Sequence, residues 1–133
     1  MISVRQLRFQ LDNGSGVPAY RQIIDAVLAG MASGTLAPGD QLPTVRQLAV
    51  DLSINPNTVI RAYRELEIRG ILSTQQGTGT FVTNKKVKMD DDERDRRIAQ
   101  LVRDVLARAG AEGIGIDDLL HQLELLKDEQ RRV

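Results

Sequence analysis

The sequence predicts a mainly α-helical fold: an N-terminal winged helix-turn-helix (three helices plus a β-hairpin wing) with a short C-terminal two-helix dimerisation tail. Three patterns predict this class. Residues 44–63 have the pattern of a short helix, a turn and a longer helix whose outer face is polar. Residues 70–82 have the pattern of a hairpin with a glycine-rich tip. Residues 90–133 contain two apolar helical stripes.

The composition divides the chain into a basic front half and an acidic tail. Residues 1–89 hold 10 Lys and Arg against 6 Asp and Glu, about +4, and residues 90–133 hold 8 against 12, about −4. A local basic face favours attraction to phosphate. The sequence has no cysteine, which excludes disulfides and thiolate metal sites. It also has no apolar run of the roughly 20 residues that span a bilayer. We expect a cytoplasmic protein with no membrane partner, no cofactor and no bound metal.

The front of the chain predicts an arm and a first helix. Residues 4–11 alternate and suggest a short strand or extended arm, which the turn-rich residues after it interrupt. Pro18 suits a first helical turn, and Gly34 suits a C-terminal cap. Between them, apolar residues recur at the spacing of one helical face: Tyr20, Ile23, Ile24, Val27, Leu28 and Met31.

Two caps predict where the second and third helices begin. Thr44 can accept a hydrogen bond from an amide one turn on, and Asn55 can do the same ahead of Pro56. Helix two buries Val45, Leu48, Ala49 and Leu52. At about 100° per residue, the core side of helix three holds Val59, Ala62, Tyr63 and Leu66.

The opposite side of helix three predicts a surface that reads duplex DNA. It carries Asn57, Thr58, Arg61, Arg64 and Glu65, together with Ile68, which we expect the wing to cover. Amides pair with adenine edges, and hydroxyls favour phosphates. Arg64 has a plainer alternative, which is an ion pair with Glu65 or Glu67. The hairpin tip predicts close approach to the minor groove, although it is also simply the turn that a hairpin needs.

The tail predicts a homodimer. Its stripes consist of Ile98, Leu101, Val102, Val105, Leu106 and Ala109, then Ile116, Leu119, Leu120, Leu123 and Leu126. Two helices in so short a segment have too little surface to bury both stripes, and a second copy supplies it. The alternative is that they fold back onto the first helix. We therefore predict a DNA-binding domain at 1–83, a linker at 84–92 and a dimerisation region at 93–130. Its contacts are Ile98, Leu101, Val102, Val105, Leu106, Leu119, Leu120 and Leu123.

A long motif with no gaps resembles the GntR family of bacterial winged-helix regulators. It runs as Gly34-x-Leu36-x-Pro38-Gly39-Asp40-x-Leu42-Pro43-Thr44-x-Arg46-x-Leu48-Ala49, then Asn57-Thr58-Val59, Ala62-Tyr63, Leu66-Glu67, Gly70 and Gly77-x-Gly79-Thr80-Phe81-Val82. The short tail is similar to the YtrA-like branch of that family.

The resemblance implies a dimeric transcription factor that binds an operator palindrome, usually as a repressor. It implies that Arg46 contacts DNA from helix two and that Gly77 enters the minor groove. Where many members have recognition-helix arginines, this chain has Pro56 and Ile60, so a borrowed operator consensus does not transfer. The predicted DNA-binding residues are Thr44, Arg46, Asn57, Thr58, Arg61, Arg64, Gln76, Gly77 and Thr78.

Other functions compete with this prediction. An activator or dual regulator would have the same fold, and a protein-binding winged-helix module is a different class. An enzyme is not expected, because the sequence has no base–nucleophile constellation and no strong metal set. The predicted partners are double-stranded operator DNA and a second copy of the chain. The sequence does not decide whether a small-molecule effector exists; such an effector would bind in the tail or at residues 83–95.

Overall fold

The structure of the chain is a computed structural model that describes residues 9–131, with side chains to residue 129. The predicted arm at residues 4–11 therefore lies largely outside the described residues. The chain divides into two compact units between Lys85 and Lys86, and each is described by itself.

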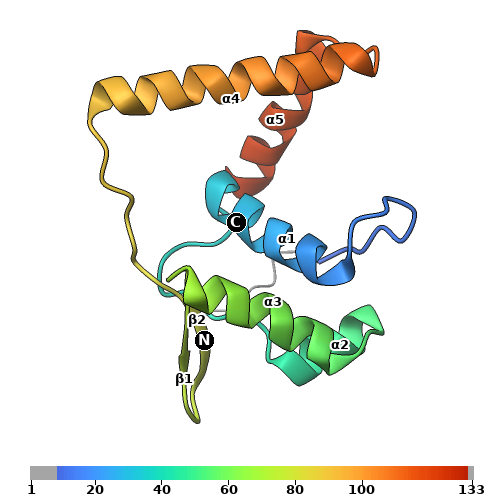
Figure 1. The fold of residues 1–133 in the computed structure, drawn as a ribbon, viewed down its shortest axis with the longest axis vertical. Helices are drawn as coiled ribbons and strands as arrows, with labels where there is room; N and C mark the ends of the chain where they lie inside the picture. The colour runs from blue at the N-terminus through green and yellow to red at the C-terminus, as the bar shows by residue number, and fades with distance from the viewer. Residues whose placement is uncertain (1–8, 132–133) are drawn as a thin grey trace. The chain divides into compact units, whose positions relative to one another are not determined.

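The first unit is a three-helix bundle followed by a two-stranded antiparallel hairpin (Figure 1). This is the predicted mainly helical winged helix-turn-helix. The hairpin follows α3 directly and extends beyond it (Figure 1). The elements are α1 (Ala19–Ser33), α2 (Val45–Leu52), α3 (Pro56–Ile68), β1 (Leu72–Gln75) and β2 (Gly79–Val82).

Short side chains fix where α2 and α3 begin. Thr44 Oγ1 accepts a hydrogen bond of 3.0 Å from the backbone N–H of Gln47. Asn55 Oδ1 accepts one of 2.8 Å from the N–H of Asn57, with Pro56 as the first helical residue. Between the helices, Ser53 adopts a left-handed conformation with φ 56°, which ends α2 and redirects the chain. Both predicted caps are confirmed.

The core lies where α1, α2 and α3 meet the base of the hairpin. The predicted inner face of α3 is buried, and Leu48 and Ala49 of α2 are buried with it. Val45 and Leu52 of α2 are only half-buried. The side chains with the least exposure are Ile23, Ile24, Val27, Leu48, Val59 and Leu66.

The expectation that the wing covers Ile68 is wrong. Its side chain is 79% exposed. The hairpin instead packs through Leu72 and Val82, which pair across the strands and are both buried. Ile68 and Leu66 lie about 200° apart around the helix at 100° per residue. A hairpin packed on the inner face therefore cannot reach the outer one.

The segment between α1 and α2 supports the hairpin from its side. The N–H of Leu42 donates to the carbonyl of Thr80 at 2.8 Å, and the N–H of Val82 donates to the carbonyl of Asp40 at 2.9 Å. At the far end, the N–H of Thr78 donates to the carbonyl of Gln75 at 2.9 Å and closes the turn. Gly77 in this turn has φ 80°, a conformation that glycine adopts without strain.

Tyr63 ties α3 to the start of α2. Its ring is buried, and its hydroxyl donates to the carbonyl of Pro43 at 2.7 Å. Burial raises the pKa of Tyr63 well above its usual value, so the hydroxyl remains a donor throughout the ordinary pH range.

The residues that follow β2 hydrogen-bond to the backbone at and just after the C-terminal end of α3. The N–H of Thr83 donates to the carbonyl of Ile71 at 2.9 Å, and Lys85 Nζ donates to the carbonyl of Arg69 at 3.0 Å. A cation suits this position because the helix dipole is negative at its C-terminal end. The domain boundary predicted at residue 83 stays a prediction.

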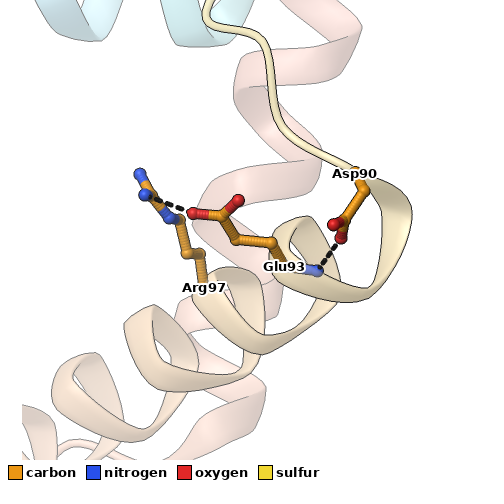
Figure 2. A network of polar contacts seen from close by, with 3 residues as sticks. All are labelled: Asp90, Glu93 and Arg97. Atoms are coloured by element: carbon orange, nitrogen blue, oxygen red, sulfur yellow. Dashed lines mark hydrogen bonds and ion pairs between the residues drawn. The ribbon is translucent and has the colours of Figure 1, made fainter.

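The second unit consists of two helices, α4 (Asp91–Ala111) and α5 (Ile116–Arg131). Figure 2 shows how α4 begins: Asp90 Oδ1 accepts a 2.7 Å hydrogen bond from the N–H of Glu93. The carboxylate of Glu93 then pairs with Arg97 at 2.6 Å, one turn on. Ahead of α5, the N–H of Gly115 donates to Asp118 Oδ2 at 3.0 Å.

None of the helices in residues 9–131 combines the length and the apolar character needed to cross a bilayer.

We expect Tyr63→Phe to lower the free energy of unfolding by about 1–3 kcal/mol, because the carbonyl of Pro43 loses its partner. Urea denaturation measures the change. The matched control is Tyr20→Phe, the same chemical change at the chain's other tyrosine, whose ring is only half-buried. Equal losses for both variants would contradict the role given to the Tyr63 hydroxyl.

Candidate nucleic-acid interface

The outer face of α3 forms one wall of an open groove. Packing of the buried stripe of α3 against α1 and α2 turns this face away from the core. Asn57, Arg61 and Arg64 are exposed on it, at the spacing of one helical face. The groove has a volume of about 610 Å³, and its lining residues are Tyr20, Asn57, Ile60, Arg61, Arg64, Glu65 and Ile68.

Arg61 lies over the ring of Tyr20, with its guanidinium carbon 3.7 Å from the ring centroid. The sequence predicted an outward Arg61 and assigned Tyr20 to the core. In the structure Tyr20 is half-buried at the start of α1, where it packs against the core and also contacts Arg61. A guanidinium over an aromatic ring is attracted to it electrostatically. The contact therefore restrains Arg61 on the groove wall, where the side chain is still exposed.

The alternative ion pairs of Arg64 are not found, because both carboxylates bind elsewhere. Glu65 pairs with Arg69 at 3.5 Å, one turn along the helix. Glu67 accepts a hydrogen bond of 2.9 Å from the hydroxyl of Thr74 in β1. Arg64 thus remains an exposed cation on the groove wall, where it adds positive charge beside Arg61.

Thr44 is the N-cap of α2, and Arg46 lies in the first turn of that helix. Both are exposed. The oxygen of Thr44 caps the helix, and its hydroxyl hydrogen is still a donor. The N-terminal end of a helix is positive and attracts anions. Thr44 and Arg46 therefore form a polar, positively charged surface at the N-terminal end of α2.

The tip of the hairpin exposes Gln76, Gly77 and Thr78. Its base is held by Gln41, whose amide nitrogen lies 3.3 Å from the carbonyl of Thr78. The same side chain lies so close to Gly79 that a Cβ there would meet it at 2.5 Å. This supporting role of Gln41 was not predicted, because nothing local in the sequence pairs it with residues 37 positions away.

The predicted site residues fall into three groups. Asn57, Arg61 and Arg64 line the groove, whereas Thr58 is half-buried and is not one of its lining residues. Thr44 and Arg46 lie at the N-terminal end of α2, and the three tip residues belong to the hairpin. The groove can donate hydrogen bonds to base edges, can accept one through the Asn57 amide oxygen, and can neutralise phosphates, which suits duplex DNA.

The fold and this polar face define a helix-turn-helix protein of the DNA-binding class. The family model of the bacterial regulatory proteins of the gntR family matches residues 19–82. An uncharacterized HTH-type transcriptional regulator of Bacillus subtilis, YhcF, is 36% identical over 115 residues, which are 86% of this chain and 85% of that protein.

The HTH-type transcriptional repressor YtrA of Bacillus subtilis is 34% identical over 110 residues, which are 83% of this chain and 85% of that protein. The chain therefore belongs to the GntR family of transcriptional regulators, in its YtrA-like branch, and is not an enzyme.

Two solved structures share the fold. YtrA from Sulfolobus acidocaldarius, a GntR-family transcription factor, has a TM-score of 0.55 and 31% identity, covering 77% of this chain and 97% of that one. The DNA-binding domain of AraR, solved in complex with an operator, has a TM-score of 0.51 and 25% identity, covering 58% of this chain and 96% of that one.

We expect the stack of Arg61 on Tyr20 to be worth about 0.5–1 kcal/mol, the range of exposed cation–π pairs. A double-mutant cycle with Tyr20→Leu and Arg61→Ala, followed by urea denaturation, measures this coupling. The control cycle combines Tyr20→Leu with Arg64→Ala, at the other arginine that lines the groove, and should give weaker coupling. Equal coupling in both cycles would contradict a specific stack.

Proposed function

We propose that the protein is a dimeric repressor that binds an operator palindrome. In this proposal α3 enters the major groove and the hairpin enters the minor groove. The observation that carries it is the outward face of α3, where an amide and two guanidinium groups are exposed side by side on a packed scaffold. The operator complex of the related AraR domain supports DNA as the partner.

Each group on α3 has a chemistry that suits duplex DNA. The amide of Asn57 matches the paired donor and acceptor of an adenine edge. Arg61, held on the Tyr20 ring, presents paired donors that suit guanine or phosphate. Arg64 lies further along the helix and suits a phosphate. Thr58 follows Asn57 on α3, and its hydroxyl suits a phosphate.

The other two groups add positioning contacts. Thr44 and Arg46 place a hydroxyl and a cation at the positive end of α2, where a phosphate is favoured. At the hairpin tip Gln76 and Thr78 flank Gly77, at which an added Cβ would meet nothing within 4 Å. Such a tip fits the narrow minor groove, and Gln41 fixes it from below.

The dimer is supported by the exposed apolar stripes of the second unit. Leu101 is 64% exposed, and much of the remaining stripe is exposed as well. Burying apolar surface contributes about 25 cal/mol per Å², so a partner surface stabilises these helices. The exposed residues among the predicted contacts are Ile98, Leu101, Val102, Val105, Leu106, Leu120 and Leu123, while Leu119 is half-buried.

Repression is favoured over activation because the relative YtrA is described as a repressor. A regulator of this class works in the cytoplasm, where the DNA is. An activator or dual regulator with the same contacts is separated from a repressor by a promoter–reporter assay. A small-molecule effector that loosens DNA binding is compatible with this proposal.

We expect Arg46→Ala to weaken operator binding by about 1–3 kcal/mol and to reduce the salt slope by about one, as for loss of one phosphate contact. A binding duplex is first selected from a random pool, and fluorescence anisotropy is measured at two salt concentrations. The control, Arg96→Ala, removes the same charge from the exposed surface of α4. Affinity independent of salt, or no enriched duplex at all, would overturn the proposed function.

We expect Leu101→Glu to convert the dimer into a monomer, because a carboxylate on the apolar stripe cannot be buried without a partner. Light scattering then gives about 14.7 kDa in place of twice that mass. Ala107→Glu places the same charge on the opposite, exposed face of α4 and should stay dimeric. A monomeric wild-type protein would point instead to stripes that cover α1 of the same subunit.

A further inference from the structure

We propose that Ile60 is a specificity-determining residue that recognises the C5-methyl group of a thymine in the major groove. The inference rests on the proposed function and goes beyond it, because it names a base that the operator must contain. It concerns an apolar side chain that lines the groove beside polar and charged ones.

Ile60 lies in the wall of the groove between polar neighbours. It lines the same groove as Asn57 and Arg61 and is half-buried there. In the described part of the chain, it is absent from the half-buried hydrophobic residues that pack against the core. Part of its apolar surface therefore lines the groove, outside the core cluster.

The position of Ile60 along α3 matches the spacing of base pairs. It follows Asn57 by three residues, which is about 4.5 Å along the axis at a rise of 1.5 Å per residue. Successive base pairs are about 3.4 Å apart. A helix that places the Asn57 amide on an adenine therefore brings Ile60 to a base pair one or two steps away.

The chemistry of the side chain selects among the four bases. In the major groove only thymine presents a methyl group, while cytosine presents an amino donor in the same region. A branched hydrocarbon gains from covering the methyl group and cannot replace the water that a covered amino group loses. Ile60 thus favours thymine and disfavours cytosine at one position in each half-site.

Ile68 provides a matched comparison on the same helix. It lines the same groove but lies near the C-terminal end of α3. Recognition helices contact base edges mainly through their N-terminal residues. Loss of the Ile68 side chain should therefore leave base preference unchanged.

The test uses the full chain and a duplex selected from a random pool. Each thymine of the duplex is replaced in turn by deoxyuridine, which removes only the methyl group. We expect one thymine per half-site at which this replacement weakens binding by about three- to fivefold, as for burial of one methyl group. That dependence should disappear in Ile60→Ala, persist in Ile60→Val and persist in Ile68→Ala.

Two results would overturn the assignment while leaving the proposed function intact. One is a selected duplex that binds tightly and shows no loss at any deoxyuridine. The other is a methyl dependence that survives in Ile60→Ala, which would assign the contact to another side chain. If no duplex is selected at all, the proposed function fails. Thermal melting confirms that each variant is folded, as expected for a residue outside the core.

Discussion

The packing of α3 against α1 and α2 determines which side of α3 is exposed. Val59, Ala62, Tyr63 and Leu66 of α3 are buried against α1 and α2, and the opposite side of the same helix must then be exposed. Tyr63 strengthens this constraint because its hydroxyl fixes α3 to the carbonyl of Pro43. The candidate DNA-binding groove is a consequence of that packing, since its main residues occupy the side that the core leaves out.

Rigid support distinguishes this surface from a flexible basic patch. Arg61 lies over the ring of Tyr20, Gln41 hydrogen-bonds the carbonyl of Thr78 at the hairpin tip, and the segment before α2 hydrogen-bonds β2. Lys85 and Thr83 close the unit over the end of α3. A side chain held in place loses less conformational freedom on binding. The same scaffold places the hydrocarbon of Ile60 beside polar groups in the groove, where in our proposal it would select a base while the arginines attract phosphate.

The two units differ in how much apolar surface each buries by itself. The first unit buries a sizeable core of its own, whereas in the second only Ala109 is among the buried hydrophobic residues of the described chain. The helices of the second unit are held locally by a capping carboxylate and pairs one turn apart (Figure 2). Their exposed stripes are the reason for proposing a second copy as partner. Dimerisation would place two recognition helices on the two halves of a palindrome.

The sequence by itself determined the helices, their caps, the hairpin and the two faces of α3, because periodicity and capping act over a few residues. It also predicted most groove residues, since one helical face follows from spacing alone. Only the tertiary structure decided that Tyr20 supports Arg61, that Gln41 supports the hairpin tip, and that Ile68 stays exposed. These contacts join residues tens of positions apart or depend on the face to which the hairpin packs. Through-space distances of this kind leave no periodic signal in the chain.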